Sequence, residues 1–208
     1  MKKTKHFIIC MVFSLAAVLL ASTVISVSAV NADAKTNWKK LYLNYITKDS
    51  WCQEHADSAR LIHINNDNIP EIFIEGCDAA SGNILLTIYK GKVYKEDLGG
   101  NGGLYYVPKK GHVYIHGGKM DQYCDGVGKL IKGKLKISWV GEFGAEDNSN
   151  LKLDKNGNPV YEYYWKGKKV SQKTYETALK KAKGNYKYKD AYSYKKMISM
   201  KELKKKLK

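Results

Sequence analysis

The chain has 208 residues, with 36 Lys or Arg against 20 Asp or Glu and a formal net charge of +16. Its hydrophobic content of 44% is typical of a folded protein and excludes an intrinsically disordered chain. Its length fits one domain with a hydrophobic core.

The first 34 residues have the pattern of a signal peptide. Three lysines lie within the first five residues, an apolar stretch covers residues 7–30, and Ala-Asp-Ala at residues 32–34 supplies a small-x-small cleavage pattern. We therefore expect a secreted protein, extracellular or associated with the cell surface. The apolar stretch is also long enough for an uncleaved anchor, since a membrane span needs about 20 residues.

The positive charge is concentrated at the C-terminal end. Residues 166–208 contain sixteen lysines and three acidic residues, whereas residues 35–165 have a net charge of only +1. The chain thus divides into a leader (1–34), a near-neutral body (35–165) and a Lys/Tyr-rich C-terminal segment (166–208). Clustered charge of one sign indicates an electrostatic partner, and a solubilising surface is the alternative.

The predicted elements of the body are one short helix followed by strands. Apolar residues at helical spacing predict a helix over residues 38–48, with Asn37 as its N-cap. Beyond residue 59, Gly91, Gly111, Gly133 and Gly157 recur in hairpin-like turns 20, 22 and 24 residues apart. That spacing holds two strands, so we expect an antiparallel β-meander, either one curved sheet or a small partly open barrel.

The C-terminal segment is predicted to return to helix. Ser171 and Gly184 have the positions of an N-cap and a C′ residue around a first helix, and Ser199 with Glu202 forms a capping box for a second. The expected fold class is therefore mainly β with flanking helices (α+β).

Residues 64–71 form the most distinctive local motif and read I-N-N-D-N-I-P-E. This segment resembles the strand-turn-strand element D-x-[DN]-x-D-G-x-P-E of exported, largely uncharacterised proteins of Gram-positive anaerobes. The resemblance is strong over residues 61–73 and looser over the hairpins and residues 167–171. It implies an exported β domain and assigns no activity.

The same motif suggests a calcium site with Asn65, Asp67 and Glu71 as oxygen ligands. However, His63 and Asn68 stand where a calcium loop has Asp and Gly. An Asx-rich turn, whose side chains bind their own backbone, is the favoured interpretation. We therefore expect no cofactor, with calcium as the alternative.

The cysteines and histidines are candidate structural or metal-binding groups. Cys52, Cys77 and Cys124 follow the leader, and an exported chain can oxidise two of them to a disulfide whose pairing stays open. His112 and His116 lie four residues apart on a predicted strand. That separation is about 13 Å, too far for both to bind one metal ion.

No catalytic motif is present, so no catalytic residue is assigned. Cys124 with His116 is one candidate pair, but a lone cysteine in an oxidising compartment is more often structural. Glu142, Glu146 and Asp147 are candidate carboxylates, although they lie where a strand runs into a loop. A secreted hydrolase is therefore the third hypothesis.

The leading hypothesis is a non-enzymatic protein that binds an anionic polymer, membrane or cell-wall surface. Lysines attract polyanions and interleaved aromatic rings add stacking. Nucleic acid is the usual partner of interleaved lysines and aromatic residues. Export makes teichoic acid, anionic lipid and acidic host glycans more accessible partners. The predicted contacts are Lys180, Lys181, Lys183, Lys187, Lys189, Lys195, Lys196, Lys204, Lys205 and Lys206, with Tyr186, Tyr188, Tyr192 and Tyr194.

The second hypothesis places binding on the sheet. In that case Tyr105, Tyr106, Tyr114 and Tyr123 contact a glycan or protein ligand, and the lysines only solubilise the chain. Packing of the C-terminal tyrosines onto the sheet is as strongly expected as their exposure, because a tyrosine can bury its ring and keep its hydroxyl in water.

Overall fold

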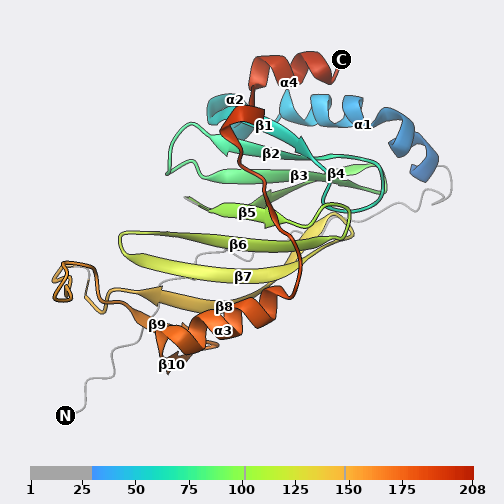
Figure 1. Ribbon diagram of the computed structural model, residues 1–208. Coiled ribbons are helices and arrows are strands. Elements are labelled where there is room, and N and C mark those ends of the chain that lie inside the picture. Colours follow the sequence, from blue (N-terminus) through green and yellow to red (C-terminus); the bar gives the residue numbers. More distant parts are fainter. Residues whose placement is uncertain (1–29, 101, 148) are drawn as a thin grey trace, which may run out of the picture.

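The computed structural model describes residues 30–208 except 101 and 148, with side chains from residue 37 onward (Figure 1). Its helices are α1 (Val30–Ile46), α2 (Ser50–Glu54), α3 (Gln172–Lys183) and α4 (Met200–Lys206), with a 3-10 turn at Tyr194–Lys196. The first sheet has, in spatial order, β12 (Ile198–Ser199), β1 (Ala56–Ile62), β2 (Glu71–Gly76), β3 (Asn83–Tyr89) and β4 (Lys92–Asp97). The second has β10 (Lys168–Val170), β9 (Glu162–Trp165), β8 (Lys134–Gly144), β7 (Gln122–Ile131), β6 (His112–Lys119), β5 (Gly103–Tyr106) and β11 (Lys189–Asp190).

The elements form four layers. Helices α1, α2 and α4 cover one face of the first sheet, and the other face of that sheet packs on the second sheet. Helix α3 lies on the outer face of the second sheet (Figure 1). We call the side of the second sheet that faces the first sheet its inner face.

The predicted fold class is confirmed: the protein is mainly antiparallel β with a short N-terminal helix and two C-terminal helices. The meander is divided into two sheets, however, and the strands of the described residues do not close into a barrel. The division falls between β4 and β5, where the chain is rich in glycine. A Cβ added at Gly102 would lie 2.2 Å from the carbonyl oxygen of Leu98, so this tight connection requires glycine.

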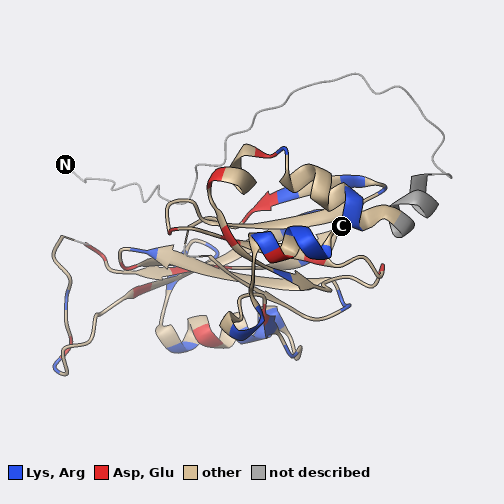
Figure 2. Cartoon of the chain, turned by 90° about the horizontal axis from the view of Figure 1, so that it is seen from above, with Lys and Arg blue, Asp and Glu red and all other residues tan. Residues whose placement is uncertain are grey.

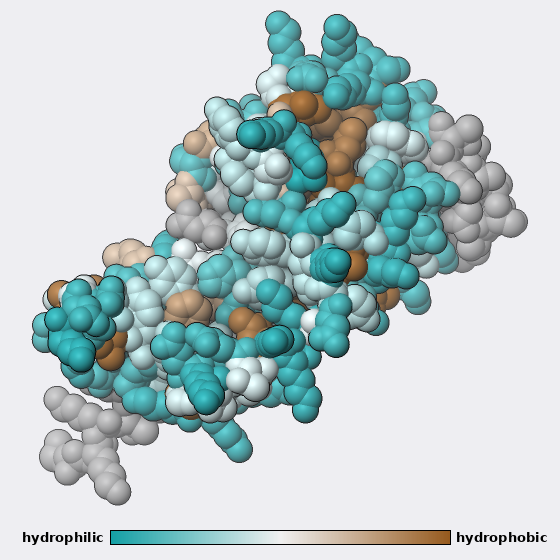
Figure 3. Space-filling view, in the orientation of Figure 1, coloured by the Kyte–Doolittle hydropathy of each residue, from teal (hydrophilic) through white to brown (hydrophobic). Residues whose placement is uncertain are grey.

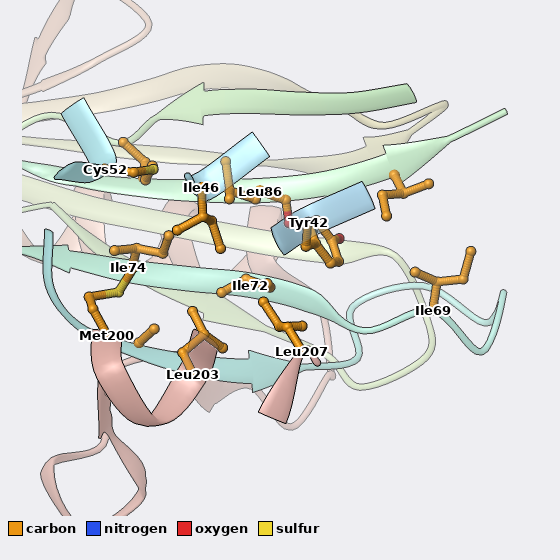
Figure 4. Packing of buried hydrophobic residues seen from close by; sticks show 13 residues of the cluster. Tyr42, Ile46, Cys52, Ile69, Ile72, Ile74, Leu86, Met200, Leu203 and Leu207 are labelled. Atoms are coloured by element: carbon orange, nitrogen blue, oxygen red, sulfur yellow. Dashed lines mark hydrogen bonds between the residues drawn. The ribbon is translucent and has the colours of Figure 1, made fainter. Parts of the chain in front are cut away.

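The first core lies between the first sheet and its helices (Figure 4). Tyr42 and Ile46 of α1, Ile72 of β2, Leu203 of α4 and Leu207, the C-cap of α4, are all at least 98% buried. The hydroxyl of Tyr42 donates to the carbonyl oxygens of residues 70 and 86, at 3.0 and 3.3 Å. The predicted apolar face of residues 38–48 is therefore confirmed.

Helix α1 begins earlier than predicted. Asn37, the predicted N-cap, has non-helical backbone angles (φ −129°, ψ 19°) and marks a kink within the helix. Its backbone therefore interrupts the helix at the position where the sequence indicates a start.

The second core joins the two sheets. Strands β2 and β3 are buried on both faces, so Phe73 and Leu85 point away from the first core and toward the second sheet. They meet Val113 and Ile115 of β6 and Leu104 of β5. A strand buried on both faces needs two covering layers, which is why a single sheet does not suffice.

The predicted turns are confirmed by backbone geometry. Gly91, Gly111, Gly133 and Gly157 have φ values of 73°, 73°, 76° and 81°. Gly133 is also confined by packing, because an added Cβ would lie 2.8 Å from atoms of Tyr89 and of Tyr94.

The C-terminal segment is part of the folded body. The hairpin of β9 and β10 spans the expected boundary between residues 165 and 166. Residues 184–199, which we call the strap, then pair with β5 through β11 and with β1 through β12 (Figure 1). The side chain of Arg60 on β1 donates to the carbonyl oxygens of Asp190 and Ala191, at 2.9 and 3.1 Å. The strap therefore links the two sheets along their edges.

Both C-terminal helices have the predicted ends. The side-chain oxygen of Ser171 accepts from the backbone of Thr174, and Gly184 ends α3 with φ 68°. Ser199 caps α4 by accepting from the backbone of Glu202 at 3.2 Å.

The predicted signal peptide lies largely outside the described residues, and α1 begins within its last five positions. Over residues 30–208, apart from 101 and 148, no helix is long and apolar enough to cross a membrane.

Candidate functional site

The predicted polyanion-binding lysines lie at the surface. All are exposed except Lys183 and Lys204, which are half-buried. Figure 3 shows that hydrophilic side chains dominate the face on which the strap and α3 lie. In the part of the chain that the structure describes, no ion pair within 4.0 Å joins any of these lysines to a carboxylate of the body. Lys206 pairs only with Glu202, at 3.4 Å within α4.

These lysines do not form one patch. Lys180 and Lys181 belong to α3 on the second sheet, whereas residues 204–206 belong to α4 above the first sheet. Figure 2 shows the lysines of these two helices as separate groups. Because the two sheets are stacked, the groups lie on opposite outer faces, joined along one edge by the strap lysines.

The strand register adds a row of basic side chains that sequence reasoning missed. His112 of β6 lies opposite Lys129 of β7, which in turn lies opposite Lys136 of β8. The ring centroids of His112 and of Tyr186 in the strap are 4.1 Å apart. His112 shares a face of β6 with Tyr114, which contacts Lys183 of α3, so this row lies on the outer face of the sheet. The sequence alone could not predict this row, because it depends on which residues pair across three strands.

Lys183 brings charge from the C-terminal segment to this row. Its ammonium group lies 3.9 Å from the ring centroid of Tyr114 and 5.5 Å from that of Tyr188. Tyr114 is two residues from His112 on the same face of β6. We call Lys129, Lys136 and Lys183, which lie around His112, the cationic face.

The cationic face concentrates like charges. Lys129 and Lys136 are exposed and directly opposite each other, an arrangement that destabilises a sheet. Burial, and next the charge of Lys129, lower the pKa of His112, so it stays neutral at neutral pH. Lys136 also interacts electrostatically with Glu96, but no described carboxylate lies within 4.0 Å of the three lysines.

A buried carboxylate lies beside the cationic face. Asp125 of β7 is 1% exposed and accepts three side-chain hydrogen bonds. They come from the Tyr114 hydroxyl (2.6 Å), Nδ1 of His116 (2.8 Å) and the Tyr175 hydroxyl of α3 (2.5 Å). We call these four residues the Asp125 centre, and it attaches α3 to the second sheet.

The hydrogen bonds keep Asp125 ionised. Burial by itself raises the pKa of Asp125, but the bonds from His116, Tyr114 and Tyr175 together bring it below its ordinary value. Burial, and next the bond to Asp125, raise the pKa of both tyrosines, which therefore stay protonated.

Tyr175 reaches Asp125 because Gly141 of β8 has no side chain. A Cβ at Gly141 would lie 2.3 Å from the Tyr175 hydroxyl oxygen. The rings of Phe143, Tyr163 and Trp165 surround Tyr175 with centroids 5.4–5.7 Å away. The sequence predicted the capped helix that carries Tyr175. It did not predict the contact with Asp125, because the two residues are 50 positions apart in the chain.

His116 is the part of the Asp125 centre that solvent reaches, with 37% of its side chain exposed. It stacks near Tyr123 and Phe143, with centroids 6.2 and 6.1 Å away. The candidate pair of Cys124 with His116 does not form. Cys124 lies opposite Gly117 and contacts its carbonyl oxygen at 3.5 Å, whereas His116 lies opposite Asp125, so the two side chains point to opposite faces of the sheet.

The candidate carboxylates do not come together as a pair. Glu142 lies on the inner face of β8. Glu146 pairs with Lys152 at 2.5 Å, and Asp147 accepts from the backbone of Ser149 at 2.9 Å.

The oxygen-rich motif binds its own backbone. Asn65 accepts from the backbone N–H of Asp67 (3.1 Å), and Asp67 accepts from that of Ile69 (2.9 Å). Glu71 is 2% exposed and accepts from the backbone of Ile64 at 2.7 Å. Burial raises the pKa of Glu71 to about 8. Among residues 37–208, with the two gaps noted, no three His, Cys, Asp or Glu side chains are placed to hold a metal ion.

The expected disulfide is not present among the described residues. Cys52 is buried in the first core, where burial raises its pKa to about 12. Cys77 is exposed, with its sulfur 3.6 Å from the Ser81 hydroxyl oxygen, and Cys124 lies on the second sheet. The three side chains thus occupy different environments.

The C-terminal tyrosines divide between packing and exposure. Tyr188 is half-buried and Tyr186 packs on His112, whereas Tyr194 is 84% exposed. Tyr192 is also exposed. Of the four tyrosines proposed for recognition on the sheet, Tyr106 and Tyr114 are buried, and Tyr105 and Tyr123 are half-buried.

The outer face of the second sheet therefore has two neighbouring features, the cationic face and the Asp125 centre. The Asp125 centre attaches a helix, whereas the cationic face is open to solvent at Lys129 and Lys136. No protein-family model matches this chain, and neither the curated proteins nor the solved structures that were searched contain a match.

Proposed function

We propose that this protein is a secreted, non-enzymatic binding protein that associates with an anionic polymer of the cell envelope or of a host surface. The cationic face makes the central contact, and the exposed lysines of α3 and the strap extend it. The observation that supports this proposal is the direct opposition of Lys129 and Lys136 on the face that Lys183 also reaches, without a described carboxylate within 4.0 Å of these lysines.

Like charges placed opposite each other cost free energy in the unbound protein. Lysines that only solubilise a chain do not need this arrangement, because they act equally well when dispersed. A bound anion neutralises these charges and removes the repulsion, so anion binding accounts for the clustering of the lysines.

The arrangement suits an extended ligand. The lysines lie on a sheet surface and continue along the strap, so a polymer can contact many of them at once. Each exposed contact is weak, and affinity grows with the number made together. Because export makes envelope polymers accessible, polyglycerol phosphate is the ligand we would test first.

The experiment compares two variants of the mature chain that lose the same charge. The first replaces Lys129, Lys136 and Lys183 by Gln. The matched control replaces Lys40, Lys48 and Lys155, for which no side-chain contact is described. Binding to polyglycerol phosphate is measured by calorimetry at several salt concentrations.

We expect the first variant to lose about tenfold in affinity near 0.15 M salt and the control to lose about twofold, because clustered charges make the stronger local field. Binding of the unchanged protein should weaken steeply as salt rises. Equal losses in the two variants would show that only net charge matters and would contradict the proposal.

A further inference from the structure

The first sheet covers only part of the inner face of the second sheet. Leu130 of β7 and Ile137 of β8 pack into the second core. Farther along the same strands, Gly126 lies opposite Trp139, and 51% of Trp139 is exposed. A large aromatic side chain therefore stands on an uncovered region of the sheet, on the face opposite α3.

Trp139 is held in place by its neighbours. A Cβ added at Gly126 would lie 2.9 Å from Cε3 and 3.0 Å from Cζ3 of Trp139, so the six-membered ring occupies the space above this glycine. The same position would be 2.6 Å from Cγ2 of Ile137. The ring is thus supported from the sheet side while much of its surface stays open to solvent.

Hydrogen-bonding groups follow Trp139 along this face of β8. Glu142 is the next residue of β8 on this face, after a register shift. Its side chain is exposed, and its carboxylate makes no ion pair with the described residues. Opposite it lies Tyr164, whose hydroxyl donates to Glu162 at 2.6 Å. Gln122, Glu142, Glu162 and Tyr164 line one shallow hollow.

This region carries carboxylates, which the cationic face lacks. It bears the carboxylates of Glu142 and Glu162, and Lys169 is paired with Glu162. Lys119 lies at the margin, where β6 ends. The unpaired carboxylate of Glu142 does not favour a polyanion, whereas a neutral ligand with hydroxyl groups can donate hydrogen bonds to it.

We infer that this uncovered inner face is a second binding site, for a neutral β-1,4-linked glycan chain. The apolar C–H face of a pyranose ring packs on Trp139, and its hydroxyl groups donate to Glu142. Gly117 and Gly126 are on the same face as Trp139 and have no side chains, so no side chain rises from the sheet at these two positions. A low surface with only a shallow hollow fits an extended, ribbon-like β-1,4 chain better than a helical α-linked one.

The test uses the mature protein and isothermal titration calorimetry with cellohexaose and chitohexaose. Salt is kept near 0.5 M, because that concentration screens the lysines of the cationic face. We expect at least one of these two oligosaccharides to bind, with an affinity that is unchanged when the salt is lowered. Maltoheptaose, which is α-linked, should bind at least about tenfold more weakly, since its curved chain cannot follow this low surface.

Three variants locate the site. Trp139→Ala should weaken binding about tenfold or more, because a central aromatic contact is lost. Glu142→Gln should weaken it about threefold, since a neutral acceptor forms a weaker bond than a carboxylate. Met120→Ala, at a side chain that is 75% exposed and lies at the β6–β7 turn, should leave it unchanged.

Several results would overturn the inference. They are failure of both β-1,4 oligosaccharides to bind, unchanged affinity in Trp139→Ala, and equal binding of maltoheptaose. Trp139 is exposed, so its replacement should preserve the fold, which circular dichroism checks. If it does not, Glu142→Ala provides the same test. The variant lacking Lys129, Lys136 and Lys183 should keep its glycan affinity, so this site and the proposed polyanion site fail or succeed independently.

Discussion

Helices lie on both outer faces of this protein, but they are attached by different physical means. On the first sheet, α4 buries the aliphatic side chains of Met200, Leu203 and Leu207. On the second sheet, Tyr175 is the one side chain of α3 that is fully buried, and it is held by Asp125. Apolar burial is non-directional and tolerant, whereas this polar attachment depends on geometry and on ionisation.

The two sheets also bury one carboxyl group each, with opposite consequences. Glu71 of the first sheet receives only backbone N–H groups, and burial raises its pKa. Asp125 of the second sheet receives three side-chain donors, which outweigh burial and lower its pKa. The difference teaches that the donors around a buried carboxyl decide its charge. The polar face is also the one that exposes uncompensated lysines, as a binding face would.

The largest expected effect comes from weakening the apolar packing of α4 on the first sheet. Leu203→Ala should lower the free energy of unfolding by about 3 kcal/mol, because it removes a fully buried side chain and leaves a cavity. Urea denaturation measures the change. Lys205→Ala on the same helix is the control and should stay within about 0.5 kcal/mol. A small effect of Leu203→Ala would mean that α4 contributes little to the first core.

The next effect concerns the pH dependence of Glu71. Its folded pKa of about 8 lies above the unfolded value near 4.5, so the folded state binds the extra proton and stability falls as pH rises between these values. Glu71→Gln should remove this dependence and be more stable than the unchanged protein at pH 8, by about 2 kcal/mol. Parallel stability–pH curves for the two proteins would contradict the prediction that Glu71 causes this pH dependence.

A smaller and local effect is expected at the Asp125 centre. Asp125→Asn should weaken the attachment of α3 by about 1.5 kcal/mol, because charge-assisted hydrogen bonds are replaced by neutral ones. Hydrogen exchange of residues 172–183 should accelerate about tenfold while that of α4 stays unchanged. Acceleration in both helices would show that the two covers are not independent.

Acid should reproduce that local effect without a mutation. The folded pKa of Asp125 is depressed, so its contribution is present above the unfolded value of about 3.9 and is lost as pH falls through the lower folded value. Exchange in α3 should therefore rise below about pH 4, relative to the intrinsic rate at the same pH. In Asp125→Asn this rise should be absent.

The smallest expected effect isolates one hydrogen bond. Tyr175→Phe keeps the ring against Phe143 and Trp165 but removes the hydroxyl that donates to Asp125. The loss should be about 1 kcal/mol, and again confined to α3. A loss as large as that of Asp125→Asn would assign most of the attachment to this single bond.

Local signals in the sequence specified the ends and types of many elements. The cap at Ser171, the stop at Gly184 and the capping serine at Ser199 are correct because each depends on residues within one helical turn. The mainly β, antiparallel class followed from strand-length apolar runs and turn glycines. The exposure of the C-terminal lysines followed from their charge.

Tertiary structure alone decided how these pieces meet. It divided the meander into two sheets, placed Lys129 opposite Lys136, and brought Tyr175 over Gly141 to a carboxylate 50 residues away. It also kept the cysteines in separate environments and left Trp139 uncovered. These features depend on strand register and sheet stacking, which arise from contacts between residues distant in the chain, and a one-residue change in register would move every side chain to the other face.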